Sequence, residues 1–164
     1  MDMGVRSTAP DLTHLGTYEM IELRDVTPDN HLDIRSLAVH PTQQQFVATV
    51  DKTLADAFVW KEALVKAGYV DGEAFGLVMI FPYEEEGASM INIVRIMVAA
   101  KHQGKGLGRA LLNETLHWID ALAAQRVRIS TFSDNVVALS LYKNIGFVEI
   151  GIEDGEVALY LNRP

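Results

Sequence analysis

Apolar and polar residues alternate early in the chain, which predicts a β-strand followed by two helices. The alternation covers residues 19–24. Thr27-Pro28-Asp29 then indicates a helix start, because it offers a capping hydroxyl, a proline at the first helical position and an acid near the positive end of the helix dipole. This helix is expected to reach about Val39. Apolar residues at near-helical spacing predict a second helix from about Thr53 to Lys66.

Three further strands are predicted in the middle of the chain, joined by tight turns. They cover residues 67–71, 74–83 and 90–98. Asp71-Gly72 is a strong hairpin signal, and the stretch 84–87, which ends in glycine, forms the next turn. The last of the three runs, MINIVRIMV, is apolar nearly throughout, as expected of a central strand that is covered on both faces.

Helices and strands alternate in the rest of the chain. A glycine-rich stretch opens a helix that is expected to reach about Ala124, and a second helix covers residues 135–144. Strands are expected over 126–132, 147–152 and 157–161, with Asp154-Gly155 as the turn between the last two. The order of elements predicts an α/β fold with a single mixed sheet in one domain, residues 17–164. Residues 1–16 are expected to form a flexible tail.

The composition excludes several functional classes. The 164 residues include no cysteine, so disulfides, thiolate metal sites and a cysteine nucleophile are excluded. The five histidines lack a second ligand at metal spacing, so we expect no metal site. The formal net charge of −8 argues against nucleic-acid binding, and such a field attracts small cations such as amines. The sequence shows neither an apolar run of membrane-spanning length nor a signal peptide, so we expect a cytoplasmic protein without membrane contact.

The glycine-rich stretch follows a strand and precedes a helix, as a phosphate-binding loop does. It runs Gln103-Gly104-Lys105-Gly106-Leu107-Gly108-Arg109 and places unobstructed backbone N–H groups at the positive end of a helix dipole. A Walker A loop needs Ser or Thr after the lysine, and a dinucleotide fingerprint needs a third glycine where Arg109 or Leu111 stands. The loop therefore fits neither nucleotide motif, and a plain flexible turn is the alternative.

Two separate motifs resemble the GNAT superfamily of N-acetyltransferases, which bind acetyl-coenzyme A (acetyl-CoA). The first is Gln103-x-x-Gly106-x-Gly108, and the second comprises Asn135, Ala138, Leu141-Tyr142 and Gly146-Phe147. The resemblance covers roughly residues 19–162 and implies the acyl-CoA N-acyltransferase fold, a mostly antiparallel sheet with helices on both faces. Shorter stretches at 21–30, 45–48, 94–98 and 155–156 look most like bacterial spermine/spermidine (polyamine and diamine) acetyltransferases.

The resemblance implies how acetyl-CoA is held. The strand at residues 95–98 would separate from its neighbour and pair with the pantetheine arm, with main-chain contacts from Ile96 and Val98 and with Met97 between them. A nearby N–H would polarise the thioester carbonyl. Tyr142 would be the general acid that protonates the thiolate leaving group. Asn135 would contact the pantetheine arm, although its position at a helix start also suits a helix cap. The remaining residues expected at the cofactor are Gln103, Gly104, Lys105, Gly106, Gly108, Arg109 and Ala138.

The acceptor side departs from the family pattern. Many relatives carry a catalytic glutamate near position 94, where this chain has Val94, and the aromatic residues expected at 91–94 are absent. A protonated amine must lose a proton before it attacks, so a base or a water chain is needed. The candidates for it are Glu22, His40, Tyr83, Glu84 and Glu156. The residues that could bind the substrate amine are Gln45, Phe46, Tyr83 and Glu84.

The function expected from the resemblance is acetyl transfer from acetyl-CoA to a primary amine of a small polyamine or diamine. Direct attack in a ternary complex is expected, because no residue looks like a covalent acetyl carrier. Two alternatives stay open: an acetyltransferase for an antibiotic or for a peptide or amino-acid amino group, and a non-catalytic acyl-CoA sensor. The family resemblance also implies a homodimer.

Overall fold

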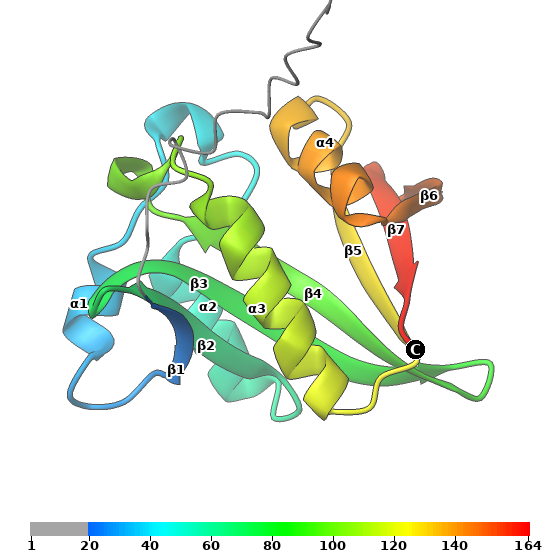
Figure 1. Cartoon of the computed structure of the whole chain (residues 1–164), viewed down its shortest axis with the longest axis horizontal. Helices are drawn as coiled ribbons and strands as arrows, with labels where there is room; N and C mark the ends of the chain where they lie inside the picture. The colour runs from blue at the N-terminus through cyan, green and yellow to red at the C-terminus, as the bar shows by residue number, and fades with distance from the viewer. Residues whose placement is uncertain (1–19) are drawn as a thin grey trace, which may run out of the picture.

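The computed structural model describes residues 20–164, which form a seven-stranded sheet in the order β1-β2-β3-β4-β5-β7-β6 (Figure 1). The strands are β1 (Ile21–Asp25), β2 (Leu64–Val70), β3 (Glu73–Glu85), β4 (Ala88–Val98), β5 (Arg126–Phe132), β6 (Val148–Glu153) and β7 (Glu156–Asn162). The helices are α1 (His31–Arg35), α2 (Val50–Val59), α3 (Leu107–Ala121) and α4 (Val136–Ile145), with short 3-10 turns η1 (Pro41–Gln43) and η2 (Ala100–His102). The tail expected over residues 1–16 lies outside the described residues.

The sheet is mixed and mostly antiparallel, as predicted. Only β4 and β5 pair in parallel, and every other neighbouring pair is antiparallel. Three hairpins close on two residues that both have positive φ, namely Asp71-Gly72, Glu86-Gly87 and Asp154-Gly155. Positive φ at both positions is the mark of the type I′ turn, whose twist matches that of the flanking strands. The turn signals in the sequence therefore predicted these hairpins correctly.

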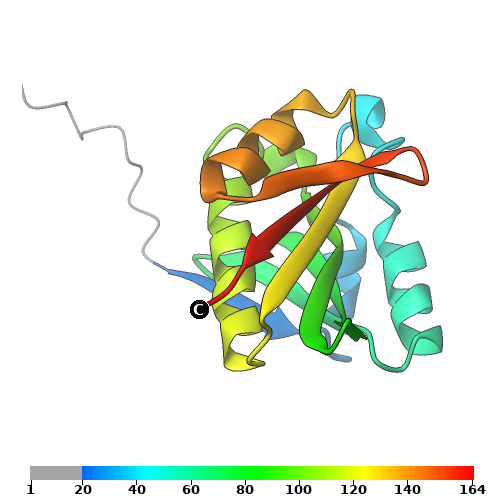
Figure 2. The same ribbon diagram turned by 90° about the vertical axis from the view of Figure 1, so that its right-hand side faces the viewer.

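Helices cover both faces of the sheet, also as predicted (Figure 2). Helices α3 and α4 lie on one face, where Leu112 and Leu116 pack against Val78 and Ile129 of the sheet. Helices α1 and α2 lie on the other face, where the core includes Ile34. None of the helices within residues 20–164 is both long and apolar enough to span a membrane.

Both predicted N-terminal helices had the wrong bounds. Helix α1 ends at Arg35 rather than near Val39, because the Ser36 hydroxyl donates to the Asp33 carbonyl at 2.6 Å and competes with continuation of the helix. Helix α2 starts three residues earlier than predicted and ends seven residues earlier. It starts at Val50, where the Thr49 side chain caps it, and residues 64–66 belong to β2 because they pair with β3.

Strands β4 and β5 share only the first part of their length. Pairing runs from Met90 opposite Arg126 to Ile93 opposite Ile129, and beyond that point the two strands separate. The register of β4 against β3 also shifts there, because Ile80 faces Ile93 while Met79 faces Arg95, which leaves Val94 as an extra residue. Such a β-bulge bends its strand and increases its twist, so it directs the rest of β4 away from β5.

A substitution at Gly76 tests how closely β3, β4 and α3 approach one another. An alanine Cβ there would lie 2.6 Å from the carbonyl oxygen of Met97 and 2.9 Å from Cδ2 of Leu111. We expect Gly76→Ala to lower the free energy of unfolding in urea by about 3 kcal/mol, the upper range for an overpacked core. The control Gly87→Ala has positive φ but open space around its Cβ, so it should cost only about 1 kcal/mol. Equal losses for the two variants would contradict this packing.

Candidate functional site

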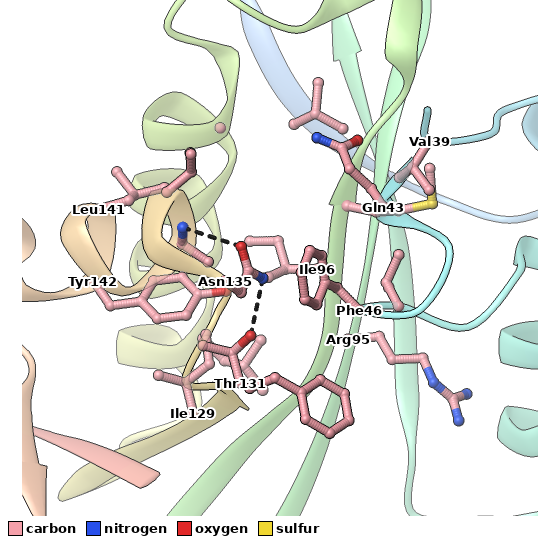
Figure 3. A pocket seen from close by; sticks show the side chains of 18 of the residues that line it. Val39, Gln43, Phe46, Arg95, Ile96, Ile129, Thr131, Asn135, Leu141 and Tyr142 are labelled. Carbon is pink, nitrogen blue, oxygen red and sulfur yellow. Dashed lines mark hydrogen bonds between the residues drawn. The ribbon is translucent and has the colours of Figure 1, made fainter. Parts of the chain in front are cut away.

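A cavity of about 690 Å³ opens where β4 and β5 separate. Figure 3 shows its two walls, with Ile129, Thr131, Asn135, Leu141 and Tyr142 on one side and Val39, Gln43 and Phe46 on the other. Residues 93–98 of β4 and 129–132 of β5 line it together. The cavity therefore lies between two strand edges that are paired with a neighbour on one side only.

The β4 edge of the cavity offers unpaired backbone groups. The Ala99 N–H donates to Phe75 of β3 at 2.8 Å, and groups alternate in direction along a strand, so Met97 also faces β3. Ile96 and Val98 then direct their backbone groups toward the cavity. The Val98 carbonyl already accepts from Nε2 of Gln103 at 2.9 Å, which leaves the Val98 N–H and both groups of Ile96 on the open edge.

The glycine-rich loop ends at an uncapped helix. Gly104 and Gly106 have φ of 74° and 79°, and Gly106 is the N-cap residue of α3. No side chain within residues 20–164 caps this helix and no acidic residue stands in its first turn, so its first N–H groups and the positive end of its dipole can meet an anion. Gly104, Gly106 and Gly108 line the cavity, whereas Lys105 and Arg109 flank them as exposed side chains outside its lining.

Gln103 holds the opposite wall in place. Its amide and that of Gln43 bond reciprocally, with N···O distances of 2.8 and 3.0 Å, which ties η1 to the end of β4. The segment after η1 then follows the cavity, so the predicted substrate residues Gln45 and Phe46 both line it. The Phe46 ring lies 6.4 Å from that of Phe132 at the end of β5, measured between centroids.

Tyr142 of α4 forms part of the other wall. Its side chain is 7% exposed and packs on Phe147 with ring centroids 6.0 Å apart. Burial raises the pKa of the Tyr142 phenol to about 12, so the hydroxyl stays protonated at neutral pH. A protonated phenol in the wall of a cavity can donate a hydrogen bond or a proton, and it cannot serve as a base there. Ala138, also predicted at the site, lines the same wall.

Asn135 caps α4. Its Oδ1 accepts from the Ala138 N–H at 3.4 Å, and its Nδ2 donates to Oγ1 of Thr131 at 2.9 Å (Figure 3). The residue therefore connects α4 to the separated end of β5. The amide also lines the cavity, so capping and contact with a ligand are compatible.

Three charged side chains line the cavity: Lys52, Arg95 and Glu156. Both cations pair with Asp56 of α2, at 2.8 Å for Lys52 and 2.5 Å for Arg95. The hydrogen bond from Lys52, followed by that from Arg95, holds the pKa of Asp56 below its ordinary value. Within residues 20–164 no cluster of three or more His, Asp or Glu is placed to hold a metal ion.

Of the candidate bases, only Glu156 lines the cavity. Glu22 pairs with Arg24 on the edge strand β1, and His40 is an exposed residue before η1. Glu84 is exposed near the tip of the β3–β4 hairpin, and Tyr83 lies beside it on β3. The structure therefore leaves four of the candidate bases outside the lining of the cavity: Glu22, His40, Tyr83 and Glu84.

Sequence reasoning missed much of the lining contributed by β5 and α2. The lining residues that were not predicted include Val39, Gln43, Lys52, Arg95, Ser130, Thr131, Phe132 and Val137. An available signal was the β5 run itself, in which the alternation of arginine with Val127 and Ile129 gives way to two adjacent hydroxyl residues at 130–131. No comparable local feature of the sequence indicates the separation of β4 from β5.

The comparisons with known proteins agree with this geometry. The acetyltransferase (GNAT) family model matches residues 45–147. The chain is similar to spermine/spermidine N(1)-acetyltransferase of Bacillus subtilis, 29% identical over 132 residues that cover 77% of this chain and 87% of that protein. It is also similar to streptothricin acetyltransferase of Escherichia coli, 24% identical over 136 residues that cover 83% of this chain and 71% of that protein.

The fold matches solved structures as well. A Bacillus subtilis acetyltransferase in complex with CoA superposes with a TM-score of 0.64 at 22% identity, over 88% of this chain and 98% of that one. The match to the family model, over residues 45–147, spans more than half of the chain. The chain therefore belongs to the acetyltransferase (GNAT) family.

Proposed function

We propose that this acetyltransferase moves the acetyl group of acetyl-CoA to a primary amine of a small polyamine or diamine, by direct attack within a ternary complex. The observation that carries the proposal is the cavity between β4 and β5, which joins an open strand edge, an uncapped helix N-terminus and a buried phenol. Acetyl-CoA carries complementary groups: a diphosphate, an arm with two amides, and a thioester.

The residues present fit this molecule. The first N–H groups of α3, with Gly104, Gly106 and Gly108 before and within its first turn, would hold the diphosphate. Ile96 and the N–H of Val98 would pair with the arm as a neighbouring strand does. When bound, acetyl-CoA supplies an activated acetyl group whose leaving group is a thiolate. Lys105 and Arg109 flank the loop and would add positive charge near the phosphates.

Two features of the chain would act on the reacting groups. A free backbone N–H on the β4 edge would donate to the thioester carbonyl, which stabilises negative charge that develops on its oxygen. The Tyr142 hydroxyl would donate its proton to the departing sulfur, and its protonated state at neutral pH suits this role. Neither group needs to move far, because both belong to packed secondary structure.

Several observations support an oligoamine acceptor. The chain is similar to a spermine/spermidine acetyltransferase, it carries a net charge of −8, and both cations of the cavity are already paired with Asp56. Phe46 and Phe132 offer apolar surface to the methylene segments of such a chain. Similarity to a streptothricin acetyltransferase favours an amine-bearing antibiotic as the second candidate.

The homodimer expected from the family resemblance stays a prediction. The edge strand β6 exposes Val148, Ile150 and Ile152, and an exposed apolar edge strand is a surface that proteins commonly cover. Sedimentation at micromolar concentration checks this point, and a monomer would contradict it.

A panel of acceptors tests the proposed activity. We expect release of CoA thiol with spermidine, spermine and a linear diamine, and a lower kcat/KM with streptothricin, an aminoglycoside and a peptide amino terminus. Turnover of the antibiotic or the peptide without turnover of spermidine would overturn the choice of acceptor. Tight binding of CoA without turnover of any acceptor would instead favour the sensor.

A conservative substitution tests the general acid. Tyr142→Phe keeps the ring and its packing but removes the proton donor, so kcat should fall by about 10²–10⁴-fold while the Kd for acetyl-CoA stays nearly unchanged. Tyr69→Phe is the matched control, because Tyr69 is equally buried but packs in the core on the α1 and α2 side. Full kcat of Tyr142→Phe at saturating substrates would show that the residue only packs.

A further inference from the structure

Glu156 is fixed on two sides by the sheet. It is the first residue of β7, directly after the Asp154-Gly155 turn, and it faces Glu153 on β6 and Phe132 on β5 in the strand register. A residue on a strand that pairs on both sides has little backbone conformational freedom. Its carboxylate lies in the lining of the cavity, at the end where β5 has separated from β4.

Among residues 20–164, one side-chain hydrogen bond orients the carboxylate. The Ser130 hydroxyl donates to Oε2 of Glu156 at 2.8 Å, from a β5 residue placed diagonally to it on the same face. Because this bond engages one carboxylate oxygen, the other oxygen, Oε1, stays available to a ligand. A short hydroxyl donor holds a carboxylate in place without neutralising its charge.

The charge of Glu156 is not balanced by the cations of the cavity. Lys52 and Arg95 both donate to Oδ2 of Asp56, and no Lys, Arg or His within residues 20–164 forms an ion pair with Glu156. Glu156 is also the one carboxylate among the described residues that line the cavity, and no histidine stands beside it. An incoming ammonium group would therefore find its counterion at this position.

We propose that Glu156 is the catalytic residue that receives the attacking amine and takes up its proton, a role that rests on the proposed acetyl transfer. The bound ammonium group gives one proton to the carboxylate, which passes it to solvent, and the neutral nitrogen then forms a bond to the acetyl carbon. The carbon–sulfur bond breaks, and the sulfur keeps the electron pair and takes the proton of the Tyr142 hydroxyl. The nitrogen loses its second proton, which returns through solvent to the Tyr142 oxygen. The products are the amide, the thiol and one released proton.

The two titratable groups of the site then have separate tasks. Burial keeps the Tyr142 phenol protonated at neutral pH, so it can act only as a donor. Glu156, the carboxylate in the lining of the cavity, acts as the acceptor. Strand β4 carries no carboxylate and has Val94 at its bulge, whereas Glu156 supplies a carboxylate to the same cavity from β7.

Glu156→Gln tests this assignment, with Glu153→Gln as the matched control. Both changes remove one negative charge from the same hairpin, but Glu153 pairs with Arg128 and does not line the cavity. We expect Glu156→Gln to lower kcat/KM for spermidine by at least about 10²-fold. The Kd for acetyl-CoA should not change in calorimetry, and Glu153→Gln should stay within about threefold of the parent protein.

A weakly basic primary amine, such as a trifluoroethylamine, separates proton uptake from a purely structural role. It is already neutral at the assay pH, so Glu156→Gln should slow its acetylation less than tenfold. An equal loss for both amines, or no loss for either, would overturn the assignment. Ser130→Ala should cost less than Glu156→Gln, because it loosens the carboxylate without removing it.

Binding of spermidine to the protein saturated with CoA provides a readout that needs no turnover. Glu156→Gln should weaken this binding at least tenfold, and Glu153→Gln should not. If the parent protein binds spermidine through Glu156 but transfers no acetyl group, the acetyl-transfer proposal fails while the amine site stands. If Glu156→Gln leaves spermidine binding unchanged, the amine site fails.

Discussion

Strands β4 and β5 pair in parallel from Met90 to Ile93 and then separate, and the rest of the site depends on that separation. The bulge at Val94 turns β4 away, and β5 continues to pair with β7 on its other edge. A sheet interrupted in this way would expose backbone groups and core side chains. Core packing stabilises the interrupted sheet, since Ile93 and Ile129 pack in the same core as Leu112 of α3 and Tyr142 of α4.

The walls of the cavity are held by polar contacts that connect distant parts of the chain. Gln43 and Gln103 bond reciprocally and fasten η1 to the end of β4, and Asn135 joins α4 to Thr131 of β5. These contacts do not close the cavity, because each lies at its border. The separated edges therefore stay available, and a ligand with amide groups can replace the missing strand.

The charges along the cavity suit two ligands, one with an anionic end and the other with an amine. The uncapped start of α3 is a positive end without a competing acid in its first turn, whereas α4 is capped by its own Asn135. At the other end, Asp56 binds Lys52 and Arg95. Among the described residues that line the cavity, Glu156 is the carboxylate, and it has no ion-pair partner within that part of the chain.

Local signals in the sequence predicted most of the fold and part of the site. Asp71-Gly72 and Asp154-Gly155 fixed two hairpins, because a type I′ turn needs positive φ, and the glycines before α3 marked the anion-binding loop. The ends of α1 and α2 were wrong, because a Ser36 side-chain bond and the pairing of β2 with β3 outweighed helical periodicity. Four of the five base candidates lie outside the cavity lining, because the distance of Glu156 from the others depends on strand order rather than on spacing.

The separation of β4 from β5 was expected from the family resemblance alone, because residue spacing and periodicity could not predict it, for the same reason. It depends on which residues of two strands about 36 positions apart still pair, as Asn92 and Arg128 do. Such pairing is decided by the twist of the whole sheet and by the helices packed on it. Sequence periodicity reports only which face of each strand is apolar.

Amide hydrogen exchange at Ile96 and Val98 tests the central claim most directly, because the claim is that this edge of β4 is open until a ligand pairs with it. In the free protein both amides should exchange faster than that of Met97, which faces β3. With saturating CoA, Ile96 and Val98 should become protected while Met97 changes little. If CoA binds and the exchange of Ile96 and Val98 stays unchanged, or if both amides are already protected in the free protein, the open strand edge is not the binding surface.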